Sequence, residues 1–131
     1  MEYEMMANEF LKKTETTFNV LHYFGKVDKW GGKMDKWEVE LFRNNKSWTF
    51  NFYMGLGHNG AEPTAYDVLA SLTKYEVGTL EDFCSEFGYE IFDEYGMRNI
   101  ETYHTYKAVK AEYKHVVEMF GDVLDELCEI A

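Results

Sequence analysis

The chain has 131 residues and a formal net charge of −11, with 46% hydrophobic and 18% aromatic residues. This length predicts a single domain, 1–131, and so high an aromatic share excludes a disordered chain. No apolar run approaches the roughly 20 residues that span a bilayer. The first residues, Met1-Glu2-Tyr3-Glu4, are acidic, whereas a secretory signal starts basic. We therefore expect no membrane association and a cytoplasmic location.

The charge is unevenly distributed along the chain. Residues 1–60 contain eight acids and eight Lys or Arg, whereas residues 61–131 contain sixteen acids and five Lys or Arg, so the second half carries all of the −11. Such a surface repels nucleic acid and attracts basic surfaces. We expect no direct nucleic-acid binding. The plainer alternative is that acidity keeps the protein in solution.

Three segments in the first half alternate apolar and polar residues with the period of a β-strand. They are 16–26, with Phe18, Val20, His22 and Phe24 on one face, then the Trp37, Val39, Leu41 segment, then the Trp48, Phe50, Phe52, Met54 segment. Residues 28–34, with Gly31-Gly32, indicate a loop, and 43–46 indicate a polar turn. A short helix over 5–13 precedes them. The first half therefore predicts a β meander.

The second half favours helices. One opens at Pro63 or Thr64, a short one follows 79–82 and ends at Gly88, and a long one begins between 93 and 99 and breaks at Gly121. We expect Trp37, Val39, Leu41, Trp48, Phe50 and Phe52 to face the helix stripe of Tyr103, Tyr106, Val109 and Tyr113. The predicted fold class is α+β, a three-stranded antiparallel β meander covered by C-terminal helices.

No standard catalytic motif occurs in the sequence: it has no phosphate-binding loop, no G-x-S-x-G elbow and no H-E-x-x-H. We therefore expect that the protein is not an enzyme. Two acidic clusters stand out instead. One holds Glu112, Glu118, Asp122, Asp125, Glu126 and Glu129, and the other holds Glu81, Asp82, Glu86, Glu90, Asp93 and Glu94. Carboxylates on helices can imitate a row of phosphates, although a charge run is more often a solvated face.

Four residues have side chains that suit a soft metal such as zinc: His58, Cys84, His104 and Cys128. Their separations of 26, 20 and 24 residues exclude a local zinc knuckle, so only the fold can bring them together. The alternative for the two cysteines is a pair of reduced, packed thiols.

Residues 54–106 resemble a widespread family of small phage and prophage proteins. The resemblance rests on Met54-Gly55-Leu56-Gly57-His58, on 63–72, on 80–89 and on Glu101-Thr102-Tyr103. Family members share the histidine and the cysteine, which implies a zinc ion held by His58 and Cys84, with His104 as the next ligand. Where the family has a second cysteine this chain has Tyr106, and where the family has Asp-x-Asp-Ser it has 90–95.

The resemblance extends by class to anti-CRISPR proteins. It implies a phage-encoded inhibitor in a bacterial host cell that blocks guide or target-DNA engagement by Cas9 or another nucleic-acid-handling protein. We expect the partner to meet Glu118, Asp122, Asp125 and Glu126, with Tyr89, Phe92 and Tyr95 as aromatic anchors; these three could equally pack between helices. The alternatives are a small zinc-binding structural or regulatory protein and a metal-dependent hydrolase.

Overall fold

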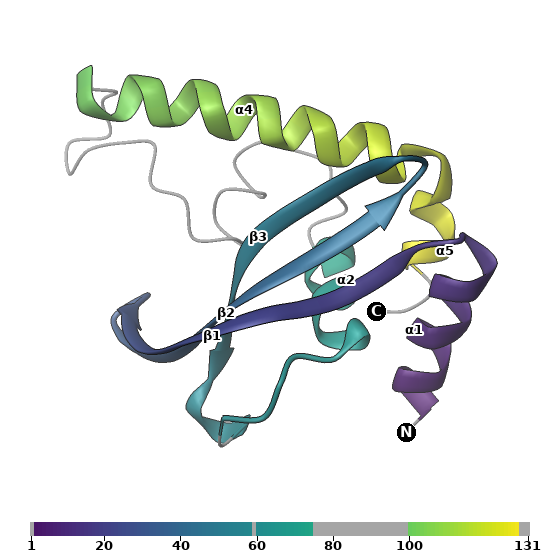
Figure 1. Ribbon diagram of the computed structural model, residues 1–131, viewed down its shortest axis with the longest axis horizontal. Coiled ribbons are helices and arrows are strands. Elements are labelled where there is room, and N and C mark those ends of the chain that lie inside the picture. The colour runs from purple at the N-terminus through teal and green to yellow at the C-terminus, as the bar shows by residue number, and fades with distance from the viewer. Residues whose placement is uncertain (1, 59, 75–99, 129–131) are drawn as a thin grey trace.

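The computed structural model describes residues 2–58, 60–74 and 100–128, without the side chains of 56, 73, 74, 100–106, 124 and 128. The elements run in the order α1 (Glu2–Lys13), β1 (Thr17–Lys29), β2 (Gly32–Arg43), β3 (Lys46–Gly55), the 3-10 helix η1 (Leu56–His58), α2 (Ala65–Lys74), α4 (Ile100–Phe120), the 3-10 helix η2 (Gly121–Val123) and α5 (Leu124–Cys128). The predicted short helix over 79–88 lies outside the described residues. Figure 1 shows α1 and α5 at the end where both termini lie.

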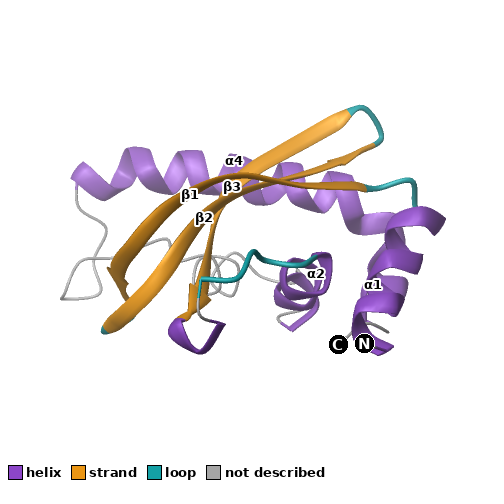
Figure 2. Cartoon of the chain, turned by 60° about the horizontal axis from the view of Figure 1, so that its bottom comes forward, coloured by secondary structure: helices purple, strands orange, loops and turns teal. Residues whose placement is uncertain are grey.

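The strands form one antiparallel sheet in the order β1-β2-β3, so the predicted α+β class and β meander are confirmed. Figure 2 shows them as one twisted layer, the usual consequence of L-residue sterics. Both connections are two-residue turns with positive φ: Asn44 (54°) and Asn45 (61°) after β2, and Trp30 (52°) and Gly31 (78°) after β1. Positive φ at both central residues matches the twist of a hairpin. Most of the loop predicted over 28–34 is therefore strand.

The face predicted for β1 is right at Phe18 and Val20 and wrong beyond them. Register shifts occur between Val20 and His22 and again between Tyr23 and Gly25. Each bulge adds a residue and inverts the alternation of side chains. As a result Tyr23, rather than His22, lies opposite Trp37 on the helix-covered face, whereas His22 lies opposite Glu38 on the other face.

The core lies between the sheet and the helices. All six predicted strand residues are buried. The helices bury two residues of α1, four of α2, four of α4 and two beyond it: Ala7, Phe10, Ala65, Val68, Leu69, Leu72, Val109, Val116, Met119, Phe120, Val123 and Leu127. Tyr113 packs against this core only in part. The predicted contacts of Tyr103 and Tyr106 lie outside the described side chains. Helices from both halves of the chain, and not only the C-terminal ones, therefore cover the sheet.

Local signals mark where α2 begins and where α4 ends. Thr64 caps α2: its Oγ1 accepts a hydrogen bond from the Asp67 amide (3.2 Å), and Asp67 Oδ2 accepts one from the Thr64 amide (2.8 Å). This reciprocal pair satisfies amides that a helix start leaves free. At the C-terminal end of α4, Gly121 follows Phe120 and begins η2, so the helix breaks at this glycine as predicted. Among the described helices, none combines the length and the apolar character that crossing a membrane requires.

Candidate functional site

The first residues of β3 hold α4 through three side-chain contacts spaced one helical turn apart. Trp48 Nε1 donates a hydrogen bond to Glu112 (2.6 Å), His115 Nε2 lies 2.8 Å from the Ser47 carbonyl, and Lys46 Nζ donates to Glu118 (3.2 Å). Residues 46, 47 and 48 thus meet 118, 115 and 112, so α4 runs antiparallel to β3 along this contact. Two of the predicted cluster acids therefore bind the sheet.

Arg43 fixes the corner where α4 ends. Its guanidinium binds both carboxylate oxygens of Asp122 (2.6 and 2.9 Å) and donates to the carbonyls of Met119 and, at 3.3 Å, Thr14. The Arg43 side chain is 7% exposed, whereas that of Asp122 is 63% exposed. One buried arginine thus joins the end of α1, the β2–β3 hairpin and the α4–η2 corner. A bidentate pair of this kind fixes geometry as well as charge.

The same arginine keeps Asp122 ionised. The hydrogen bonds from Arg43 hold the pKa of the Asp122 carboxyl below its ordinary value of 3.8, against a smaller opposing effect of burial. The carboxylate therefore stays charged, and it still presents most of its surface to solvent. Asp122 can bind Arg43 and a partner's cation together, because a carboxylate offers about four acceptor positions.

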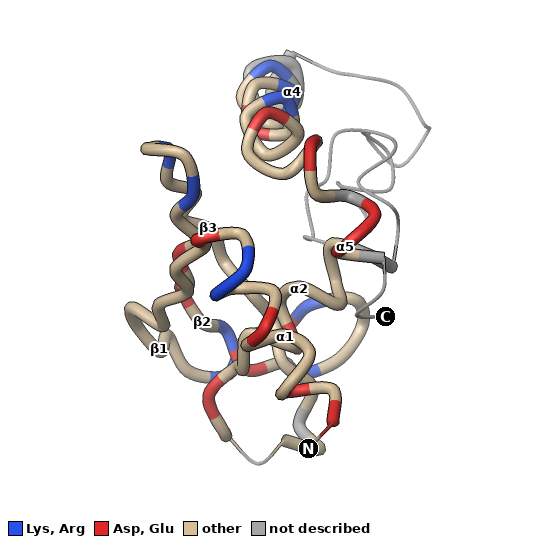
Figure 3. Tube along the Cα trace, turned by 90° about the vertical axis from the view of Figure 1, so that its right-hand side faces the viewer, with Lys and Arg blue, Asp and Glu red and all other residues tan. Residues whose placement is uncertain are grey.

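The other predicted partner-binding residues fall in two groups. Asp125 is exposed and Glu126 half-buried in α5, immediately beyond the corner. Figure 3 looks onto this end and shows acidic residues along η2 and α5. Tyr89, Phe92 and Tyr95 lie outside the described residues, so their anchoring role stays a prediction. The structure thus places Glu118, Asp122, Asp125 and Glu126 on one corner, which we call the carboxylate corner.

The predicted zinc ligands are not brought together by the described part of the chain. His58 lies exposed in η1, whereas Cys84 and the side chain of His104 fall outside what the structure describes. Within the described residues, no three His, Cys, Asp or Glu side chains group as a metal site requires. Zinc binding by His58, Cys84 and His104 stays a prediction.

A buried carboxylate was not anticipated from the sequence. Asp35 is fully buried on the helix-covered face of β2, where its Oδ1 accepts hydrogen bonds from Tyr23 Oη (2.7 Å) and Lys26 Nζ (3.2 Å). The Tyr23 bond lowers the pKa of Asp35, although burial opposes it. The same bond raises the pKa of Tyr23. The two donors on Oδ1 hold the bulged part of β1 against β2, whereas Asp35 Oδ2 is buried without a hydrogen-bond partner.

The burial of two charged residues, Asp35 and Arg43, was not anticipated, although both follow a pattern that the sequence contains. Asp35 and Arg43 continue the inward alternation of Trp37, Val39 and Leu41 by one step at each end. The predicted strand included neither residue: Asp35 follows the loop predicted over 28–34, and Arg43 begins the turn predicted over 43–46. Charged side chains are rarely buried without partners, so their burial was not expected. The alternation of β2 is the sequence signal that could have found both residues. Their partners come from other elements: β1 for Asp35, and the α4–η2 corner for Arg43.

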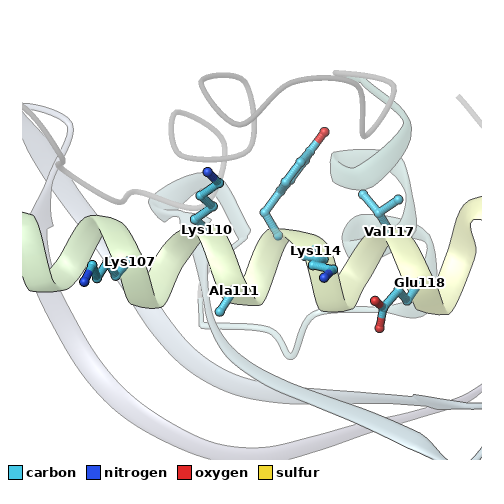
Figure 4. A pocket seen from close by; sticks show the side chains of 7 residues that line it. Lys107, Lys110, Ala111, Lys114, Val117 and Glu118 are labelled. Carbon is cyan, nitrogen blue, oxygen red and sulfur yellow. The ribbon is translucent and has the colours of Figure 1, made fainter.

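A hollow of about 700 Å³ lies along α4. Figure 4 shows the side chains that line it, among them three lysines one helical turn apart; the described lining is Lys107, Lys110, Ala111, Tyr113, Lys114, Val117 and Glu118. All of these residues come from one helix. A ligand site needs groups that converge from several directions, so we assign this hollow no ligand.

Comparison with known proteins adds no further constraint: no family model, no curated protein and no solved structure matches this chain. The phage-family resemblance of residues 54–106 stays a prediction.

Proposed function

We propose that this protein is an inhibitor that binds a basic, nucleic-acid-handling surface of a host effector, with Cas9 the first candidate. The carboxylate corner is the surface that meets it. The effector's positively charged channel holds a guide–target heteroduplex through its backbone. A row of carboxylates offers that channel the same negative charge as the heteroduplex backbone. Binding there would obstruct guide or target-DNA engagement.

The observation that carries the proposal is the rigidity of the corner. Arg43 binds Asp122 with two hydrogen bonds and also binds the Met119 carbonyl in the last turn of α4. The carboxylate of Asp122 is therefore held before any partner arrives, and Lys46 contacts that of Glu118 at 3.2 Å. Binding then loses less conformational entropy than it would with flexible side chains.

The charge of the corner stays negative after its internal pairs are counted. Glu118, Asp122, Asp125 and Glu126 contribute four negative charges, and Arg43 and Lys46 contribute two positive ones. Residues 118–131 contain no Lys or Arg. Such a surface speeds encounter with a basic partner, and salt weakens the effect.

The test is a DNA-cleavage assay with purified Cas9 orthologues, run with the wild type and with two variants of equal charge change. The corner variant carries Glu118→Gln, Asp125→Asn and Glu126→Gln. It leaves Asp122 intact, because its partner Arg43 is buried and a change there would disturb the fold. The matched control carries Glu9→Gln, Glu15→Gln and Glu62→Gln at exposed positions elsewhere.

We expect the wild type and the control to inhibit cleavage and the corner variant to inhibit at least about tenfold less, since even one close charge pair across an interface is worth about 1.5 kcal/mol or more. Absence of inhibition by the folded wild type would remove Cas9 as the partner. Equal loss in both variants would assign the effect to net charge rather than to the corner.

A further inference from the structure

The sheet face that the described helices leave uncovered carries an aromatic cluster beside the β1–β2 turn. Trp30 and Phe24 are 55% and 47% exposed. The Trp30 ring meets the Tyr53 ring edge-on, with centroids 5.4 Å apart. Tyr53 lies opposite Lys36 in the β2–β3 pairing. We call Phe24, Trp30, Tyr53, Lys29 and Lys36 the hairpin patch.

Two lysines lie against the rings of this patch. Lys29 Nζ lies 5.2 Å from the centroid of the Tyr53 ring, and Lys36 Nζ lies 4.9 Å from that of Phe24. Both distances are typical of cation–π contacts. The hairpin from 24 to 36 holds four lysines and two aspartates. Lys26 and Lys33 pair with those two aspartates, Asp35 and Asp28, which leaves Lys29 and Lys36 as the lysines that lie against the patch rings. The patch is therefore locally basic in a protein whose net charge is −11.

Trp30 is poorly suited to its own backbone. It has a φ of 52°, a conformation that asparagine and glycine adopt readily and a bulky residue rarely does. The equivalent turn after β2 uses Asn44 and Asn45. More than half of the Trp30 surface is exposed, so little burial offsets the strain. Strained residues of this kind cluster at functional sites.

We infer that the hairpin patch binds single-stranded nucleic acid. Its rings would stack on successive bases, and Lys29 and Lys36 would contact the phosphates between them. Aromatic side chains on an open sheet face, with cations beside them, are the recurring chemistry of single-strand recognition. A duplex hides its base faces in its own stack, so it offers this patch nothing to stack on.

The charge of the carboxylate corner does not decide this question, because screening limits its reach. The Debye length at physiological ionic strength is about 8 Å. Figure 1 shows the β1–β2 turn and α5 at opposite ends of the longest dimension of the molecule. Glu38 lies on the patch face two residues beyond Lys36 on β2, and Asp28, directly before Lys29, is paired with Lys33. The inference departs from our expectation of no nucleic-acid contact, and it concerns a surface separate from the carboxylate corner.

Tryptophan fluorescence provides the test. Trp37 and Trp48 are buried, so quenching by an added strand reports Trp30. The purified full chain is titrated with single-stranded DNA and RNA of about ten nucleotides, a length within the usual site size of one sheet domain, and with a duplex. The variants are Phe24→Ala, Lys36→Gln and Glu38→Gln, with Phe42→Ala as control. Phe42 is an exposed aromatic on the same face, opposite Thr17 and Ser47.

We expect saturable quenching by a single strand, with DNA and RNA compared to show which is preferred. Phe24→Ala should weaken the affinity by about fivefold or more, the effect of losing one stacking ring. Lys36→Gln should weaken it and Glu38→Gln should strengthen it. Phe42→Ala should leave it unchanged. Two phosphate contacts predict a log–log salt slope of about −1.4.

Three results would overturn the inference: no saturable quenching at low salt, equal affinity for the duplex, or equal losses in Phe24→Ala and Phe42→Ala. The affinity of the Trp30→Asn variant for a labelled strand, measured by fluorescence anisotropy, should also fall, and an unchanged affinity would overturn the inference as well. If Trp30→Asn lost Cas9 inhibition while the wild type bound no strand, the patch would be a protein contact instead.

Discussion

At the residue scale, the two hairpin turns show how one backbone conformation suits different side chains. Asn44 and Asn45 both adopt positive φ after β2, whereas Trp30 shares that conformation with Gly31 after β1. Asparagine tolerates positive φ because its short polar side chain bonds to the local backbone. Tryptophan has no such compensation. Trp30 is therefore a residue whose substitution can stabilise the fold.

We predict that Trp30→Asn raises the free energy of unfolding by about 1 kcal/mol, the cost per residue of this conformation for a side chain that cannot compensate. Urea unfolding followed by circular dichroism measures the change. Trp30→Ala is the matched control, because it removes the same ring and keeps the strained backbone. A larger gain in Trp30→Ala than in Trp30→Asn would show that the ring, and not its φ, is the unfavourable feature.

Zinc binding is the second prediction at this scale. Protein purified without chelator should hold about one zinc ion per chain, and the ion should tie η1 to parts of the chain beyond it, because structural zinc contributes directly to folding. Elemental analysis of the wild type and of His58→Ala and Cys84→Ala measures it. Zinc content that neither substitution changes would exclude both residues as ligands.

At the element scale, the inner face of the sheet carries the stability. Phe50 is buried between Val39 across the β2–β3 pairing and the helices. We predict that Phe50→Ala lowers the free energy of unfolding by about 3–5 kcal/mol, as for other buried aromatics. Thr49→Ala on the other face is the control and should change it by less than about 0.5 kcal/mol. Similar losses at the two positions would mean that both faces are packed.

The Arg43 corner is the second feature at this scale. Replacing Arg43 by leucine removes its bonds to the Met119 and Thr14 carbonyls as well as the pair with Asp122. We predict a loss of at least about 2 kcal/mol in the free energy of unfolding, because hydrogen bonds to charged groups are worth about 1.5–3 kcal/mol each. Lys46→Gln, which removes the exposed pair with Glu118, should cost less than about 1 kcal/mol.

The corner also makes stability depend on pH. The folded pKa of Asp122 lies below its ordinary 3.8, so folding favours the ionised form. This stabilisation is complete above the unfolded pKa and is lost as pH falls from about 4 through the folded pKa. Asp35 acts in the same direction. Urea unfolding at several pH values should therefore show acid destabilisation that is shallower in Asp122→Asn and does not vanish, since Asp35 remains.

At the scale of the whole molecule, charge segregation dominates. The net charge of −11 comes from residues 61–131, while the hairpin from 24 to 36 is locally basic. Like charges at a distance repel and destabilise the compact state. The same segregation gives the molecule two surfaces of opposite sign, the carboxylate corner and the hairpin patch.

We predict that salt stabilises the fold. Raising the ionic strength from about 10 to about 150 mM shortens the Debye length from about 30 to about 8 Å and weakens the long-range repulsion. The thermal midpoint should rise, and the rise should be smaller in the Glu9→Gln, Glu15→Gln, Glu62→Gln variant. A falling midpoint would show that attractive pairs such as Lys46–Glu118 outweigh the repulsion.

The sequence by itself determined the meander, the inner faces of β2 and β3, the second hairpin turn, the start of α2 and the end of α4. These depend on alternation, on helical period and on residues such as Asn45 and Gly121, which act over a few neighbours. Only the tertiary structure decided the two bulges of β1, the burial of Asp35 and the contacts of Arg43. The Arg43–Asp122 pair joins residues 79 apart, and Lys46–Glu118 joins residues 72 apart. Such pairs form only when α4 packs along β3, and a local pattern holds no record of that packing.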